Sequence, residues 1–85
     1  MARYEVVLRK SVLKDLGSIP KKDVARIMSA IGTLANNPRP PQSRKLSGQE
    51  RYRLRQGVYR IIYSIEDKQL IVCVVKVGHR REVYR

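Results

Sequence analysis

Residues 52–77, YRLRQGVYRIIYSIEDKQLIVCVVKV, decide the fold. Tyr52 and Leu54 alternate with Arg53 and Arg55, which is the period of a strand with one apolar and one polar face. Turn-forming residues, Gln-Gly at 56–57 and Glu-Asp-Lys at 66–68, flank a second apolar segment. The third segment, 69–77, is apolar enough to lie at the centre of a sheet. The whole stretch therefore predicts a three-stranded antiparallel meander.

The residues before the meander predict one strand and two helices. Residues 4–8 are β-branched and apolar between two arginines, as in a short buried strand. Ser11 can cap a short helix that Gly17 ends, and Pro20 stands at the start of a longer one. The apolar positions at helical spacing are Val12, Leu13 and Leu16 in the first helix and Val24, Ile27, Met28, Ile31 and Leu34 in the second. The proline-rich residues 36–48 predict a connecting loop.

This order of elements indicates an α+β fold, with an N-terminal strand, a two-helix hairpin and the meander. Both helices are expected on one face of the sheet, which leaves the other face available to a ligand. The 85 residues, 42% of them hydrophobic, suit one domain spanning residues 1–85. No apolar run approaches the ~18 residues of a membrane helix, and residues 1–10 lack the apolar segment of a signal peptide. We therefore expect a cytoplasmic protein.

Charge is the most informative bulk property of the chain. It has 19 Lys and Arg residues against 7 Asp and Glu, for a net charge of +12. Such a chain attracts polyanions, among them RNA, DNA, an acidic membrane surface and an acidic protein. One Cys and one His cannot form an internal disulfide or a zinc site, and scattered acids supply a carboxylate metal site poorly. We expect neither a metal nor another cofactor.

The polar face of the first meander strand is one candidate site. Arg53 and Arg55 project to the same side about 6.5 to 7 Å apart, close to the spacing of successive phosphates in a nucleic acid strand. Arg60, across the tight turn, could join them. Arginine favours bidentate phosphate recognition. The alternative is that these side chains are merely solvated on an exposed sheet face.

The polar tail, residues 78–85 (GHRREVYR), is a second candidate. The imidazole of His79, the guanidinium groups and the phenol of Tyr84 could bind phosphate, transfer a proton and stack on a base. The alternative is a frayed basic terminus. Gly78 argues against that alternative, because a glycine directly after a buried strand is typical of a shaped turn.

The segments YRLR (52–55), GVYRIIY (57–63) and VGHRREVY (77–84) resemble the RelE toxins of bacterial type II toxin-antitoxin systems, in the RelE/ParE superfamily. The resemblance extends over essentially the whole chain and implies a microbial-ribonuclease-like fold. It implies an endoribonuclease, an mRNA interferase that enters the ribosomal A site, cuts mRNA and inhibits translation. The implied reaction is metal-independent: the 2′-hydroxyl attacks phosphorus, giving a 2′,3′-cyclic phosphate and a 5′-hydroxyl.

The resemblance also implies partners and residue roles. The partners are the ribosome, mRNA and a RelB-like antitoxin, with a toxin-antitoxin heterotetramer as one arrangement and no membrane. Arg53 and Arg55 match the two basic residues of the family's second strand, and Arg60 would contact the scissile phosphate. The matching tail positions are Arg80, for phosphate contact and leaving-group assistance, and Tyr84, for orienting or stacking on a base. Supporting RNA-binding candidates are Arg81, Arg51 and Lys45.

The proton acceptor stays open in this comparison. Some relatives have lysine where this chain has Arg53 and Arg55, and a guanidinium with a pKa above ~12 is rarely neutral. Either the hydroxyl is activated electrostatically, or another group accepts the proton. His79 has a suitable unperturbed pKa near 6.5, although it could instead brace the turn and neighbouring cations would depress its pKa. Glu50 and Glu82 are the other nearby bases.

Two further functions compete with the nuclease. ParE-like relatives of the same fold bind DNA gyrase and inhibit it, and a basic RNA-binding or ribosome-binding module need not be catalytic. The arginine set disfavours gyrase inhibition, because a gyrase-binding surface does not need that constellation. Composition alone leaves the inert module open.

Overall fold

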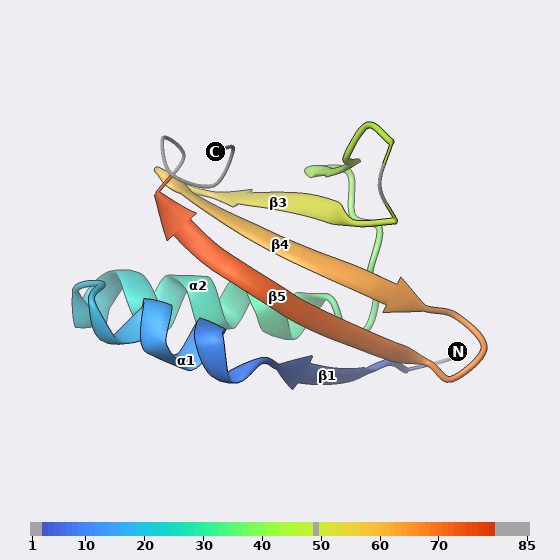
Figure 1. The fold of residues 1–85 in the computed structure, drawn as a ribbon, viewed down its shortest axis with the longest axis horizontal. Helices are drawn as coiled ribbons and strands as arrows, with labels where there is room; N and C mark the ends of the chain where they lie inside the picture. The colour runs from blue at the N-terminus through green and yellow to red at the C-terminus, as the bar shows by residue number, and fades with distance from the viewer. Residues whose placement is uncertain (1–2, 49, 80–85) are drawn as a thin grey trace.

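The computed structural model describes residues 3–48 and 50–79 as one five-stranded sheet with two helices (Figure 1). The elements are β1 (Glu5–Leu8), α1 (Lys10–Gly17), α2 (Lys21–Thr33), β2 (Ser43–Lys45), β3 (Tyr52–Gln56), β4 (Tyr59–Glu66) and β5 (Ile71–His79). The strand order is β1-β5-β4-β3-β2. β1 runs parallel to β5, and every other pair of neighbours is antiparallel. The predicted α+β architecture is confirmed.

The meander of β3, β4 and β5 forms as its sequence predicts. Gly57 has a φ of 60°, which suits the tight turn between β3 and β4. The register pairs Leu54 with Ile61 and Ile61 with Val77, so these apolar side chains share one face. A bulge then shifts the register, since Ile62 pairs with Lys76 but Tyr63 pairs with Val74. The extra residue lets both Val74 and Val77 reach the core.

Both helices cover the same face of the meander (Figure 1). α1 packs against β5, and α2 packs against β3 and β4. The buried core cluster consists of Val12, Ile27, Ile31, Leu34, Leu54, Ile61, Tyr63, Val72, Val74 and Val77. Burial of each large aliphatic side chain contributes about 1.5 to 3 kcal/mol, so this aliphatic cluster is the main source of stability. Among the described residues, neither helix combines the length and apolarity needed to cross a membrane.

Several local predictions were wrong. Gly78 was expected to form a turn directly after the last strand, but β5 continues to His79 and Gly78 pairs with Arg60 within it. The prediction of a loop over residues 36–48 missed β2, which pairs with β3 once the prolines have ended. Ser11 does not cap α1, because the helix already begins at Lys10. Arg9 occupies the cap position without a side-chain hydrogen bond. Leu13 and Met28 are 57% and 39% exposed, so the apolar stripe of each helix is narrower than its sequence suggested.

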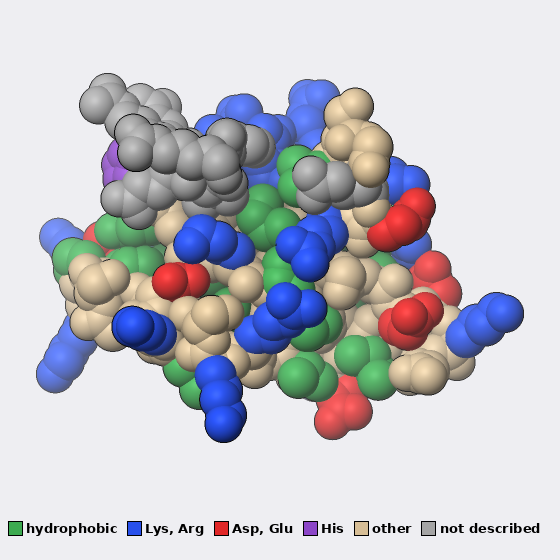
Figure 2. Space-filling view, in the orientation of Figure 1, with side chains coloured by type: hydrophobic (Ala, Val, Ile, Leu, Met, Phe, Trp, Pro, Cys, Tyr) green, Lys and Arg blue, Asp and Glu red, His purple; other side chains and the backbone are tan. Residues whose placement is uncertain are grey.

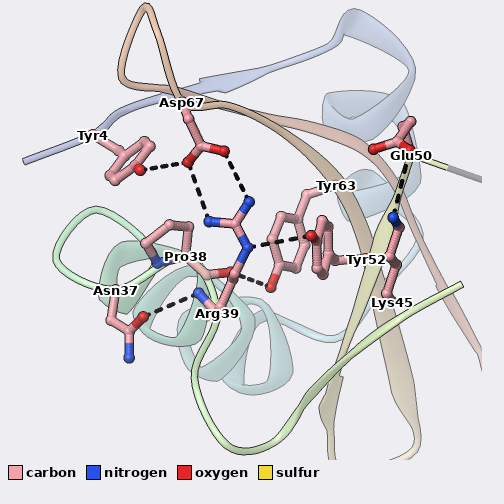
Figure 3. A network of polar contacts seen from close by, with 9 residues as sticks. All are labelled: Tyr4, Asn37, Pro38, Arg39, Lys45, Glu50, Tyr52, Tyr63 and Asp67. Carbon is pink, nitrogen blue, oxygen red and sulfur yellow. Dashed lines mark hydrogen bonds and ion pairs between the residues drawn. The ribbon is translucent and has the colours of Figure 1, made fainter.

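A polar network joins the start of β1, the proline-rich loop and the β4–β5 turn (Figure 3). Arg39 donates two hydrogen bonds to the carboxylate of Asp67, at 2.9 and 3.1 Å, and Tyr4 donates a third at 2.7 Å. The Arg39 guanidinium also lies 5.3 Å from the ring centroid of Tyr52, which stacks on Tyr63 at 5.8 Å. These contacts fix the end of the meander that lies away from Arg60 and His79.

Candidate functional site

The sheet face opposite the helices carries Arg53, Arg55 and Arg60 of the predicted site. Strand alternation and register place Arg44, Arg53, Arg55, Arg60 and Lys76 on this side, which we call the basic face. Figure 2 shows Lys and Arg side chains over much of the visible side of the molecule, whereas acidic side chains lie mostly toward the end with the β4–β5 turn. The positive field is thus stronger away from that turn.

Two rows of paired positions cross the basic face. In one row Arg44 lies beside Arg53, and Ile62 separates Arg53 from Lys76. In the other row Arg60 lies between Arg55 and Gly78. No other described residue is paired with these in either row. Since neighbouring strands are about 4.8 Å apart, each row holds cations close enough to contact successive groups of one polyanion.

Arg60 is the most unusual residue of the basic face. It is only 7% exposed, and its Nε atom is buried without a hydrogen-bond acceptor among the described residues. A buried N–H group without an acceptor costs about 1 to 3 kcal/mol, more when it is charged. Its strand partner Gly78 has no side chain. An oxyanion bound here would supply the missing acceptor.

The other arginines of the basic face differ in exposure. Arg53 is half-buried and Arg55 is exposed. Ile62 is buried, although it lies outside the core cluster on the helix side. The basic face therefore combines an apolar floor with cations of graded accessibility, an arrangement that strengthens charge interactions by excluding some water.

His79 lies on the other side of the sheet from Arg60. Its ring meets Tyr59 edge to face, with centroids 6.3 Å apart and planes at 78°, and Tyr59 packs against the core cluster on the helix side. Sequence reasoning grouped His79 with the phosphate-binding arginines, and the structure separates it from the basic face. Arg80, Arg81 and Tyr84 lie outside the described residues.

The supporting candidates Lys45 and Arg51 lie at the far end of β3 from Arg55. Lys45 pairs with Tyr52 in the register and forms a 3.4 Å ion pair with Glu50. Arg51 is exposed directly before β3, where its carbonyl accepts a hydrogen bond from Leu46. Neither lies in the two rows of the basic face.

Sequence reasoning missed two cations of the basic face. Lys76 stands between Val75 and Val77, and this alternation was a usable signal that it points away from the core. Arg44 offered no such signal, because β2 is a three-residue strand with no readable period. In the described part of the chain, no three His, Cys, Asp or Glu side chains gather in a way that could hold a metal ion.

Comparison with known proteins identifies the family. Residues 6–84 match the family model described as "ParE toxin of type II toxin-antitoxin system, parDE". The chain belongs to this family. The toxin is 31% identical to toxin RelG of Mycobacterium tuberculosis, over 96% of this chain and 97% of that one. It is 30% identical to a putative toxin RelE1 of Methanocaldococcus jannaschii, over 98% and 97% of the two chains.

Solved structures agree with this identification. The toxin superposes on a chain of the archaeal RelE–RelB complex from Pyrococcus horikoshii with a TM-score of 0.83 and 32% identity, covering 98% and 100% of the two chains. It superposes on a chain of the complex RelBE2 from Mycobacterium tuberculosis with a TM-score of 0.81 and 27% identity, covering 92% and 99%. The resemblance to RelE toxins is thereby confirmed, and the protein is a type II toxin of the RelE/ParE superfamily.

Proposed function

We propose that this toxin is a metal-independent endoribonuclease that acts in the cytoplasm and cuts mRNA in the ribosomal A site. The observation that carries the proposal is the buried guanidinium of Arg60, whose Nε lacks an acceptor among the described residues. A phosphodiester oxygen has the charge and geometry to accept from it. Arg55, its neighbour in the register, is exposed and could hold an adjacent phosphate.

The proposed reaction needs charge stabilisation more than a special nucleophile. The 2′-oxygen forms a bond to the adjacent phosphorus while the bond from phosphorus to the 5′-oxygen breaks. The hydroxyl proton passes to an acceptor, and the departing 5′-oxygen gains a proton, which leaves a 2′,3′-cyclic phosphate and a 5′-hydroxyl. Fixed cations aimed at the pentavalent phosphorane lower its free energy without reorganising during the reaction. Arg53, Arg55 and Arg60 are the described residues suited to this role.

We do not assign proton transfer to His79. Its ring contacts Tyr59 on the helix side, whereas a base for the 2′-hydroxyl must reach the phosphate held on the basic face. We propose that the arginines activate the hydroxyl electrostatically and that the ribosome aligns it. The resemblance gives leaving-group assistance to Arg80 and base stacking to Tyr84.

An antitoxin is the proposed regulator. The related toxins from Pyrococcus horikoshii and Mycobacterium tuberculosis were solved as RelE–RelB and RelBE2 complexes. An acidic RelB-like partner that covers the basic face would neutralise its charge and exclude RNA. Two toxins and two antitoxins in a heterotetramer are one arrangement of such a complex.

Primer extension on a defined mRNA, with and without programmed ribosomes whose A site is empty, tests the proposal. We expect cuts in the A-site codon only when ribosomes are present. Arg60→Ala should reduce the cleavage rate by on the order of 100-fold or more, as loss of an oxyanion donor does. Lys22→Ala, which removes an exposed cation from α2, is the matched control and should cleave normally. Intact cleavage in the double variant Arg60→Ala, Arg80→Ala would refute the site assignment.

Gyrase inhibition is the second candidate, because the matching family model is that of ParE toxins. A folded protein that cuts no mRNA on ribosomes but blocks DNA supercoiling by gyrase would establish this alternative. A protein that does neither, yet binds RNA in a salt-dependent way, would be a non-catalytic binding module.

A further inference from the structure

A pocket of about 240 Å³ lies on the helix side of the sheet, beside the end of β5. The side chains used in the argument below are Asp15, Ser18, Ile19, Tyr59 and His79. The lining also includes Val77, Gly78 and Lys76, of which Lys76 belongs to the basic face. Drug-sized ligands usually occupy about 300 to 1,000 Å³, so a pocket of this size suits a single flat ring system.

The pocket exists because β5 is longer than its neighbour β1. The pairing of the two strands ends where Leu8 meets Val74, although the next amide, that of Arg9, still donates to the Val74 carbonyl at 3.1 Å. Farther along β5, the amide of Val77 donates instead to Oδ2 of Asp15 at 3.3 Å. A side chain from α1 therefore takes the place of a strand at this edge.

Asp15 has unused hydrogen-bonding capacity. A carboxylate offers about four acceptor positions, and among the described residues only the Val77 amide uses one, at Oδ2. No cation of the described segments forms an ion pair with Asp15. The pocket therefore offers a ligand a carboxylate acceptor, beside the Ser18 hydroxyl, which donates to the backbone carbonyl of Asp15 at 2.9 Å.

The remaining walls are aromatic and apolar. The rings of Tyr59 and His79 stand edge to face, and the Tyr59 hydroxyl donates to Oδ2 of Asp23 at 3.4 Å, which restrains that ring. Ile19 adds an aliphatic surface. Proteins that recognise single-stranded RNA hold splayed bases in this way, by stacking on Tyr or His and by hydrogen bonds to the base edge.

We infer that this pocket binds one unpaired guanine base of the RNA, an inference that rests on the proposed function. Guanine presents two adjacent donors, N1–H and the N2 amino group, and a carboxylate is their natural acceptor. The pocket includes Gly78, which pairs with Arg60, so RNA on the basic face has only to pass the exposed edge of β5 to reach it. The net charge of +12 favours RNA over a basic peptide as the occupant.

The experiment is a titration of the ¹⁵N-labelled toxin with the four nucleoside 5′-monophosphates, which share one phosphate and differ in the base. We expect GMP to shift the amide signals of Ser18, Ile19 and Gly78, with a Kd on the order of tenfold lower than that of UMP. Asp15→Asn should abolish this preference while its side-chain oxygen still accepts from Val77. Glu66→Gln, which removes an exposed carboxylate at the other end of β4, is the control and should keep the preference.

The outcomes test guanine binding in the pocket independently of the proposed nuclease activity. Equal binding of all four nucleotides, with no shifts at the pocket amides, would overturn the guanine assignment even if ribosomes programmed with mRNA are cut. Saturation of the pocket by a Lys-rich or Arg-rich peptide in place of GMP would overturn it as well. Selective GMP binding without any mRNA cleavage would support the pocket and defeat the proposed nuclease activity.

Discussion

Arg60 lies directly opposite Gly78 in the register of β4 and β5, and it is the most buried cation of the basic face. Gly78 is buried and contributes no side chain, while Arg60 contributes a guanidinium whose Nε has no acceptor among the described residues. Folding thus buries part of a cation without hydrogen bonding it fully. Such a cost is typical of a binding site whose ligand completes it.

Replacing Arg60 by an apolar residue of similar length should stabilise the toxin and inactivate it. Arg60→Met removes the buried N–H group without an acceptor and keeps most of the packing of the side chain. We expect the free energy of unfolding to rise by about 1 to 3 kcal/mol, measured by urea denaturation, while ribosome-dependent cleavage is lost. A less stable Arg60→Met protein would mean that the guanidinium is fully satisfied in the folded toxin.

The absence of a side chain at position 78 should matter for activity more than for folding. Gly78→Val places a branched side chain beside Arg60 on the basic face, in a strand that favours valine. We expect cleavage to fall at least tenfold, because a displaced cation loses its alignment with the phosphate. Gly78→Ala should give an intermediate rate. Circular dichroism of both variants checks that the sheet is intact, and normal cleavage by folded Gly78→Val would contradict the role of this pair.

The parts of the fold that could be predicted from the sequence are those in which apolar and polar residues alternate regularly along an element. Leu54 alternates with arginines, and the structure puts it in the core with the arginines on the other face. Tyr63, two residues after Ile61 on the same face of β4, is fully buried. The prediction that Met28 belongs to the buried stripe was wrong, because the sheet covers a narrower stripe of α2 than the helical spacing of apolar residues suggests. Periodicity marks which side of an element is apolar, but tertiary packing decides how much of that side is covered.

The candidate site was less predictable, because its geometry depends on pairing between strands. Arg44 joins Arg53 only through the three-residue strand β2, whose pairing is a tertiary event. His79 follows Gly78 directly, and a one-residue step along a strand reverses the side on which a side chain lies. His79 therefore lies on the helix side of the sheet, whereas Arg53, Arg55 and Arg60 lie on the basic face.

The Arg39–Asp67 ion pair should make the toxin sensitive to acid. The Arg39 guanidinium, and after it the Tyr4 hydroxyl, lowers the pKa of Asp67 below its ordinary value of 3.8. A lowered folded pKa means that the contribution to stability is present above about pH 4 and is lost as the pH falls through the folded pKa. We expect the Tm of the wild type to decline more than that of Asp67→Asn between pH 5 and pH 3, a range set by the ordinary Asp pKa of about 4. Glu50→Gln, in the exposed pair with Lys45, is the control and should follow the wild type.

The hydroxyl of Tyr63 should contribute to stability without affecting catalysis. It donates a 2.7 Å hydrogen bond to the carbonyl of Pro38, and the Tyr63 side chain is fully buried. Tyr63→Phe leaves that buried carbonyl without its donor, so the free energy of unfolding should fall by about 1 to 2 kcal/mol in urea denaturation. Ribosome-dependent cleavage by the folded variant, at urea concentrations below its unfolding midpoint, should stay normal. Tyr63 lies on the helix side, and the basic face keeps its register. A loss of cleavage by folded Tyr63→Phe would show that the core contact with the proline-rich loop reaches the basic face, and that the two faces of this sheet are not independent.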